Sequence, residues 1–344
     1  MRKNRSGYIK NLLLPCFCLS AVTGITTAVI IFIFKAVSSV VISVSENIYA
    51  YVRSNPVYLP VLISVTALVG LFAAMLLRKA TDCGGGGIPT SVAALRGLVP
   101  FNWIKSIFVI PISSLMSFLC GVPLGNEGPC VQIGTAVGNG AVRLAGEKQR
   151  AWSRYVMTGG ACSGFVVATG APVSGVLFAV EEAHRRFSPM LFMVASISVG
   201  FGEITMRLLG ELFGVNVDMF EITVDTVLPT KYMWIPLFVG LICGICAIFF
   251  TRVYRAVRTL LQGRLAKIPF TLKVVIIFAI VGFVGFFSAD SIGSGHALTD
   301  RLLHAEGIGF ILIILFLVRA LLLVFSNNVG VTGGCLYQRL RSVR

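Results

Sequence analysis

Charged residues are scarce in this sequence of 344 residues. Aspartate, glutamate, lysine and arginine together make up 12% of the chain, well below the roughly 25% that is usual in soluble domains. Hydrophobic residues make up 56% and the mean hydropathy is +0.89. A soluble fold has no interior large enough to hide that much apolar surface, so the composition excludes one.

Residues that carry enzymatic or metal chemistry are few and dispersed. The three histidines, His184, His296 and His304, are too far apart in sequence to indicate a metal site. The nine cysteines are scattered through apolar runs, with no CxxC pair near a histidine and no spacing typical of a disulfide framework. The HExxH, GxSxG and GxxxxGK motifs are absent. The sequence therefore predicts no enzyme, no metal and no cofactor.

Acidic residues are the scarcer of the two charge signs, with 14 against 29 basic residues and a formal net charge of +15. In a soluble protein this excess would suggest nucleic acid. Here the basic residues lie in short connections beside apolar runs, where they set membrane orientation, so we expect no nucleic-acid partner. We place the basic segments 1–10, 143–154, 185–186 and 252–273 in the cytoplasm. The segment 216–230 carries Asp218, Glu221 and Asp225 without lysine or arginine, and we place it outside.

Long apolar runs fill most of the chain. Five of them contain no charged residue: 12–34, 57–77, 106–124, 155–180 and 233–250. Each is near the ~20 residues that a helix needs to cross a ~30 Å hydrocarbon core, and we count roughly nine or ten such segments in all. The first run is too long for a signal peptide and lacks a cleavage site. The sequence predicts an all-α, multi-pass integral membrane protein in a lipid bilayer.

Clusters of glycine and proline interrupt several of these runs, at 84–89, 121–129, 159–172 and 330–334. A helix that breaks in lipid leaves unpaired N–H and C=O groups, each costing several kcal/mol, so such breaks survive only where they line a cavity inside the protein. In transporters, the half-helices aim the positive ends of their dipoles at an anionic substrate. The breaks therefore predict an anion site near the middle of the bilayer.

The organisation along the chain suggests one unit built from two halves. We expect a cytoplasmic N-terminus at 1–10, a first transmembrane repeat at 11–213, an external loop at 214–231, a partial second repeat at 232–338 and a basic C-terminus at 339–344. An inverted repeat, with tilted and broken helices, would explain why a glycine break recurs at 330–334.

The sharpest local signal is Gly125-Asn126-Glu127-Gly128-Pro129. Proline is tolerated in the first turn of a helix, and the free amides at a helix N-terminus bind anions. The Glu127 carboxylate is itself an anion, so it could occupy the site when ionised and leave when protonated. Glu127 would then be both a gate and a proton carrier. The alternative is that Glu127 only caps its own helix.

This segment and the CVQIGTAVG that follows resemble the GREGP motif and the next helix of the CLC family of chloride channels and proton-coupled anion antiporters. Three other blocks come in the family's order. Gly85-Gly86-Gly87-Ile88-Pro89 resembles GSGIP, the segment 170–182 (GAPVSGVLFAVEE) resembles the one that ends in the internal glutamates, and Gly333-Gly334 resembles the start of GxFxP. The resemblance runs from about residue 12 to 334. It implies a CLC-type inverted-repeat bundle, a homodimer with one pathway in each protomer and, because no regulatory domain follows, a prokaryotic plasma membrane.

The resemblance also implies roles for individual residues. Glu127 matches the external gating glutamate, and Glu182 matches the internal proton glutamate. For Glu182, the residues alone leave open a cytoplasm-facing acid paired with Arg185 or Arg186. The anion would be held by Gly125, Asn126, Gly128 and Pro129, by Gly85, Gly86, Gly87, Ile88 and Pro89, and by Gly334, Cys335 and Leu336. Together these imply proton-coupled antiport of a halide. A passive anion channel and a non-functional fragment are the alternatives, and an enzyme using Glu127 and Glu182 as acid and base would lack a nucleophile.

Three positions depart from the family pattern. Gly86 stands where the motif has a serine, so only its backbone could hold the anion. Asn126 stands where the motif has a basic residue, which resembles the fluoride-exporting subclass and keeps both chloride and fluoride open. After Gly334 the chain reads CLYQ and ends among arginines. This resembles a C-terminal truncation that leaves the second half incomplete.

Overall fold

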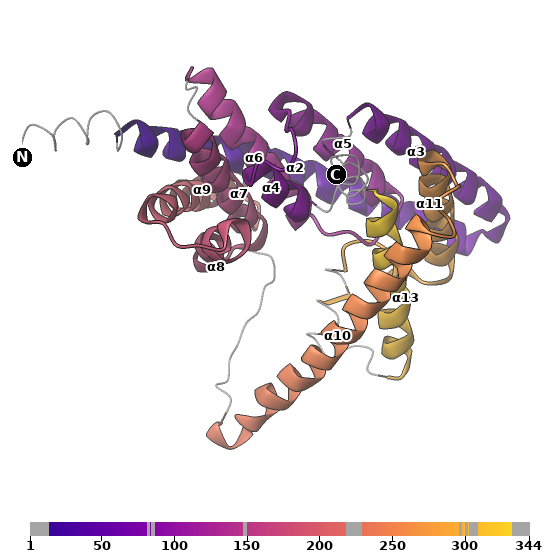
Figure 1. Ribbon diagram of the computed structural model, residues 1–344. Coiled ribbons are helices and arrows are strands. Elements are labelled where there is room, and N and C mark those ends of the chain that lie inside the picture. Colours follow the sequence, from indigo (N-terminus) through magenta and orange to yellow (C-terminus); the bar gives the residue numbers. More distant parts are fainter. Residues whose placement is uncertain are drawn as a thin grey trace, which may run out of the picture.

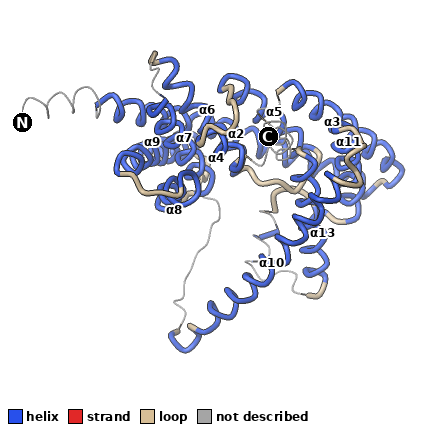
Figure 2. The backbone as a smooth tube through the Cα atoms, in the orientation of Figure 1, coloured by secondary structure: helices blue, strands red, loops and turns tan. Residues whose placement is uncertain are grey.

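The computed structural model describes residues 14–80, 83, 87–146, 150–217, 229–295, 298, 299, 302 and 309–331. Within these residues the regular structure is helical and contains no strand (Figures 1 and 2), which confirms the all-α class. The α-helices in chain order are α2 (Leu14–Ser54), α3 (Leu59–Lys79), α4 (Ile88–Leu95), α5 (Trp103–Leu119), α6 (Glu127–Leu144), α7 (Arg150–Thr169), α8 (Pro172–Phe178), α9 (Pro189–Phe213), α10 (Trp234–Gln262), α11 (Phe270–Phe287) and α13 (Ile311–Val329).

Six helices of the described residues are long and apolar enough to cross a membrane: Pro15–Ser54, Pro56–Lys79, Pro189–Phe213, Thr230–Gln262, Phe270–Phe287 and Ile311–Val329. The nine or ten spans that we expected exceed this number. The apolar helix α5 has 17 residues, which is short for a span, and α6 and α7 contain many glycine and polar residues. The 41 residues of α2 would extend about 60 Å, roughly twice the hydrocarbon thickness, so α2 must tilt steeply.

Several boundaries differ from those the sequence indicates. The first helix continues to Ser54, well beyond the uncharged run 12–34 in which it begins. Helix α6 begins at Glu127, inside the glycine and proline cluster 121–129. The segment 172–186 is not one α-helix, because α8 ends at Phe178 and a π-helical turn, η3 (Ala179–His184), follows. The acidic stretch 218–228 of the expected external loop and the basic segment 339–344 lie outside the described residues.

Helices α6 and α7 pack backbone against backbone. A Cβ atom at Gly134 would overlap the carbonyl oxygen of Gly160, and one at Gly160 would overlap the carbonyl oxygen of Gly134. The same relation holds between Gly164 and the carbonyl oxygen of Cys130. Small residues allow this close approach in membrane bundles. The contact places α6 in the interior, where residues from Pro129 to Gly140 are buried, and so fixes the helix whose first residue is Glu127.

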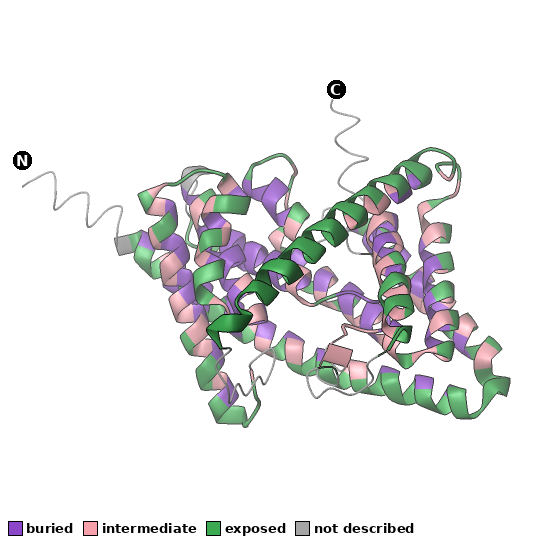
Figure 3. Cartoon of the chain, turned by 90° about the horizontal axis from the view of Figure 1, so that it is seen from below, coloured by how far each residue is buried: buried purple, intermediate pink, exposed green. Residues whose placement is uncertain are grey.

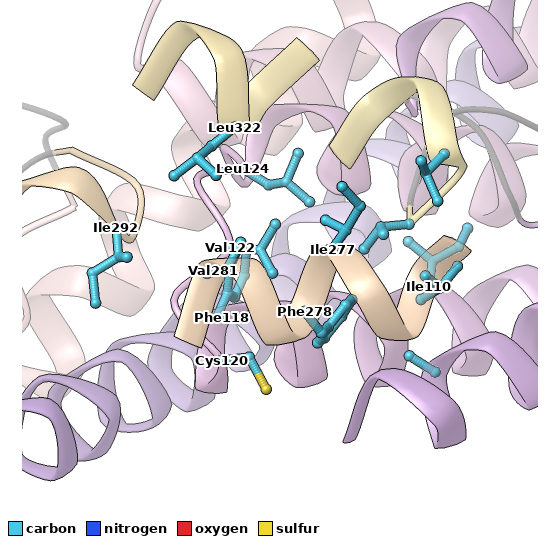
Figure 4. Packing of buried hydrophobic residues seen from close by; sticks show 14 of the residues in the cluster. Ile110, Phe118, Cys120, Val122, Leu124, Ile277, Phe278, Val281, Ile292 and Leu322 are labelled. Carbon is cyan, nitrogen blue, oxygen red and sulfur yellow. The ribbon is translucent and has the colours of Figure 1, made fainter. Parts of the chain in front are cut away.

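A second packed region joins the two halves of the chain. Helix α11 lies beside α3 (Figure 1), where the ring of Phe278 covers Gly70 and the side chain of Thr66 covers Gly282. Phe278 belongs to a cluster of buried hydrophobic residues that also includes Val281. Figure 4 shows Val122, from the connection before α6, among the side chains of this cluster. The connection that leads to Glu127 is therefore held by both halves.

Helix α10 is the least covered of the described helices. Figure 3 shows it exposed along most of its length, and none of its most apolar window is buried. Its exposed residues include Leu237, Phe238 and Leu241. In a bilayer such side chains can contact lipid without cost, because lipid tails are as apolar as they are.

Candidate functional site

Two of the glycine motifs meet in space. Gly87 precedes the first residue of α4 and has φ of +70°, and a Cβ atom there would overlap the backbone of Gly128 in the first turn of α6. The N-termini of α4 and α6 are therefore in contact. Ile88 and Pro89 form the first turn of α4, whereas Gly85 and Gly86 lie outside the described residues. The structure thus brings together the described parts of the two blocks that we expected to hold the anion.

The N-terminus of α6 presents Glu127 beside free amides. The first N–H groups of a helix have no acceptor within it, and Pro129, the third residue of α6, has no N–H to leave unpaired. Glu127 is half-buried, and its Oε2 atom folds back to the place that a side chain at Gly125 would need. The carboxylate therefore lies over the backbone just before its own helix.

Asn126 is the residue immediately before α6, but its side chain makes no capping hydrogen bond. Its Oδ1 atom is buried and has no hydrogen-bond partner among the described residues. An amide carries both an acceptor and two donors, and which of its ends points to a given place is an assignment. Asn126 therefore has hydrogen-bonding capacity left for a ligand at this helix end.

A cavity of about 530 Å³ opens in front of Glu127. Its wall includes Gly125 and Glu127 from the first half of the chain, and Phe250 of α10 and Arg319 of α13 from the second. The other lining residues are Pro123, Ser294, Gly295, Leu298, Thr299, Leu302, Leu312, Leu315, Phe316, Ala320 and Leu323. The cavity is mostly apolar, and Glu127 and Arg319 are the charged residues among its described lining.

Arg319 is a site residue that we did not single out from the sequence. Its Nη1 donates to the carbonyl oxygens of Asp290 at 2.6 Å and Ile292 at 3.0 Å, and its Nη2 donates to that of Gly293 at 2.8 Å. It thereby holds the glycine-rich loop that follows α11 at the cavity wall. A sequence signal was present, since Arg319 is the one charged residue in the apolar helix α13, and such a residue within a span is by default functional.

The same loop also bonds to the connection before α6. The backbone N–H of Gly293 donates to the carbonyl oxygen of Gly121 at 2.9 Å, and both glycines have φ of +71°. The Tyr49 hydroxyl donates to the carbonyl oxygen of the adjacent Cys120 at 2.8 Å. These bonds satisfy backbone groups that a break in the helix leaves open, and they link α2, the connection and the loop around the cavity.

Glu182 lies in η3, away from the lining of this cavity. Its side chain is exposed, and its backbone carbonyl accepts a hydrogen bond from Nη2 of Arg96 at 2.8 Å. Its carboxylate forms no ion pair with Arg185 or Arg186, so the paired arrangement that we considered is not present. Glu127 and Glu182 thus face different surroundings.

The remaining expected ligands, Gly334, Cys335 and Leu336, lie outside the described residues, as does His296 of the GSGH stretch. Within the described part of the chain, no group of three or more histidine, cysteine, aspartate or glutamate residues could hold a metal ion. The described site is therefore built from two helix N-termini, one carboxylate and one guanidinium.

Comparisons with known proteins agree on one family. The family model described as voltage gated chloride channel matches residues 69–337. A solved structure of a slow cyanobacterial Cl⁻/H⁺ antiporter matches with a TM-score of 0.79 and 21% identity over 95% of this chain and 80% of that chain. A CLC-type fluoride/proton antiporter matches with a TM-score of 0.74 and 19% identity, over 94% and 77%.

A eukaryotic CLC transporter has the same fold, with a TM-score of 0.72 and 17% identity over 91% of this chain and 55% of that chain. At these identities the structural matches establish the fold alone. The family model covers well over half of the sequence, including the whole cavity described above. The chain therefore belongs to the voltage gated chloride channel family, the CLC family.

Proposed function

We propose that this protein moves a halide across a membrane in exchange for protons, with Glu127 as the gate. The observation that carries the proposal is the position of Glu127, which is half-buried at the N-terminus of α6 and faces the cavity between the two halves of the chain. Two structural relatives are proton antiporters, one of chloride and one of fluoride, which supports the same reaction type.

The surroundings of Glu127 suit an anion. The free amides at the start of α6 and the positive end of its dipole favour negative charge. The N-terminus of α4 adjoins them through the contact of Gly87 with Gly128. The guanidinium of Arg319 adds a positive charge at the cavity wall. A halide in the apolar cavity would feel these charges more strongly than in water, because the local dielectric constant is lower.

The mechanism follows from competition between two anions for one place. When ionised, the Glu127 carboxylate occupies the positive end of α6 and excludes the halide. When protonated, it loses its charge and its attraction to the helix end, so the halide can replace it. If protonated Glu127 then turns toward the other side of the membrane and releases its proton there, the proton and the halide have moved in opposite directions.

We propose Glu182 as the group that passes protons between Glu127 and the cytoplasm. It lies in the π-helical turn η3 and its side chain is exposed, so water can reach it. It also lies next to Arg185 and Arg186, on the face that the basic connections mark as cytoplasmic. Without a second proton site the protein would be a passive channel, and this is the alternative that a coupled proton flux would exclude.

Fluoride is the second candidate substrate, and Asn126 favours it. Fluoride holds its hydration water tightly, so a site for it needs strong hydrogen-bond donors. The side chain of Asn126 comes directly before Glu127 in sequence, and its NH₂ group could supply donors. A basic residue at this position would instead favour anions that lose water easily. We further propose that the protein is a homodimer with one pathway in each protomer, in a prokaryotic plasma membrane.

The test is transport by the purified protein in liposomes, with chloride or fluoride efflux and proton uptake followed together over a series of pH values. We expect Glu127→Gln to keep an anion flux, to lose its pH dependence and to abolish coupled proton movement. Glu211→Gln, which neutralises an exposed carboxylate on α9, is the matched control and should behave like the wild type. An unchanged pH dependence in Glu127→Gln would remove the gate assignment, and no anion flux in the wild type would remove transport itself.

A further inference from the structure

A second cavity, of about 430 Å³, lies at the opposite end of α4 from Gly87. Its wall is made almost entirely of positively charged or titratable groups, and we call it the arginine pocket. The lining residues are Leu95, Arg96, Arg154, Tyr155, His184, Arg185 and Arg186. None of them lines the cavity in front of Glu127, so the arginine pocket is a separate feature of the fold.

Three elements hold the basic groups together. Arg96, at the C-terminus of α4, donates from Nε to the carbonyl oxygen of Ala183 at 3.0 Å and from Nη2 to that of Glu182 at 2.8 Å. Arg154 comes from the start of α7 and extends to Gly97, where a Cβ atom would lie 2.9 Å from its Nη2. The Nε2 atom of His184 lies 2.8 Å from Oγ1 of Thr158. The shape of the pocket is thus fixed by bonds to α4, α7 and η3.

Among the described residues, no acidic side chain balances the positive charge of the arginine pocket. No carboxylate lines it, and none of its four arginines forms an ion pair with an acidic residue of the described part of the chain. Burial lowers the pKa of His184 below its ordinary value, and the charges of Arg186, Arg96 and Arg154 lower it further. The charges of these three arginines therefore converge near His184. A cavity lined by charges of one sign attracts ions of the opposite sign.

We propose that the arginine pocket binds a phosphate group that carries more than one negative charge. The planar fork of arginine matches phosphate oxygens in pairs. Arg96 uses two of its nitrogens on the carbonyl groups of η3, but the other three arginines around the cavity still exceed what a halide could use. The pocket lies on the face that we expect to be cytoplasmic, where basic pockets between membrane helices bind phosphorylated headgroups. Two exposed apolar residues, Leu98 and Phe187, lie close in sequence to the lining residues Arg96 and Arg186. The phosphate can come from an anionic lipid or from a soluble compound.

The experiment compares the wild type with a protein that carries both Arg154→Gln and Arg186→Gln. The side chains of these two arginines are exposed and make no hydrogen bond in the described structure, so the double variant should fold. Arg264→Gln is the matched control, because Arg264 is exposed in the basic connection between α10 and α11 and does not line the pocket. Two probes are used: inorganic pyrophosphate in detergent, against sodium chloride of equal ionic strength, and nanodiscs of phosphatidylcholine with or without phosphatidic acid.

We expect the wild type and Arg264→Gln to gain thermal stability from at least one probe, and the double variant to bind that probe at least about tenfold more weakly, since each lost charge-assisted contact changes Kd by about that factor. A response to pyrophosphate identifies a soluble phosphate as ligand, and a response to phosphatidic acid alone identifies a lipid. Equal binding by the wild type and the double variant would overturn the proposal. So would an equal loss in Arg264→Gln, because net charge alone would then account for binding.

Discussion

The Oε2 atom of Glu127 occupies the space that a Cβ atom of residue 125 would need. Residue 125 must therefore lack a side chain because the carboxylate of Glu127 fills that space. This reason is separate from the backbone conformation of Gly125. The glycine before the gate allows the carboxylate to fold back over the N-terminus of α6. This relation links the motif at 125–129 directly to the proposed gate.

Changing Gly125→Ala should displace the Glu127 carboxylate while leaving its charge intact. Overfilling a packed position costs about 1 kcal/mol or more, which changes the population of the present position roughly fivefold or more. We expect anion efflux from liposomes to become correspondingly less dependent on pH. Gly200→Ala, in α9 with no atom within 4 Å of the added carbon, is the control. An unaltered pH profile for Gly125→Ala would show that the folded-back position has no part in gating.

The contact of Gly87 with Gly128 predicts a loss of stability. Gly87→Ala would place a side chain at φ of +70° and against the backbone of Gly128. With ψ of −70° beside this φ, Gly87 has a rare γ-turn conformation that costs an ordinary residue roughly 1–3 kcal/mol, and the overlap adds about as much again or more. We expect a lower Tm in detergent than for Gly200→Ala. Equal Tm values for the two variants would mean that the helix ends can separate freely.

Arg319 should contribute to both stability and transport. Arg319→Gln removes a charge from the cavity wall and the guanidinium that bonds three carbonyl oxygens, so we expect a loss of roughly 2 kcal/mol or more and a slower anion flux. Arg319→Lys keeps the charge but not the fork. It should recover flux more fully than Tm, and a Lys variant as slow as the Gln variant would contradict an electrostatic role.

His184 predicts a dependence of stability on pH. Burial and the charges of Arg186, Arg96 and Arg154 place its pKa below the ordinary value of 6.5. The unfolded chain therefore takes up the proton more readily than the folded one. The contribution of neutral His184 is complete above pH 6.5 and is lost as the pH falls toward the lower folded pKa. Thermal unfolding in phosphate-free detergent buffer should show this fall, and His184→Gln should reduce it. An identical slope in the variant would assign the effect to other groups.

Sequence reasoning predicted the membrane fold from a few physical constraints, because long runs without charge can lie only in lipid. It also predicted that glycine and proline breaks at that depth line a cavity. That the blocks at 85–89 and 125–129 serve one anion was implied by the family resemblance, and the contact of Gly87 with Gly128 is known only from the structure. Helix α4 was missed because eight residues are too short to show a periodic signal. Its bounds depend on packing against α6.

Other features depend on contacts that no local pattern contains. Arg319 binds three carbonyl groups that lie 26 to 29 residues away in sequence, and no local pattern predicts these contacts. The sequence did show a single charged residue in the apolar helix α13. Helix α8 ends at Phe178, and Arg96, more than 80 residues earlier, donates to the carbonyl oxygens of Glu182 and Ala183 in the turn that follows. The proposed roles of Glu127 and Glu182 stay predictions.

The glycine contacts between α6 and α7 have a consequence for how this protein can evolve. Because Gly134, Gly160 and Gly164 place main chain directly on main chain, there is almost no room for the middle of α6 to vary, and a mutation there would shift the whole helix. Natural variation in ion preference should therefore concentrate at the tip, at positions such as Asn126, where a side chain can change while the helix behind it stays still. Descendants of this gene could acquire a new substrate by exchanging one residue at the tip, whereas the buried stretch behind it would remain nearly invariant.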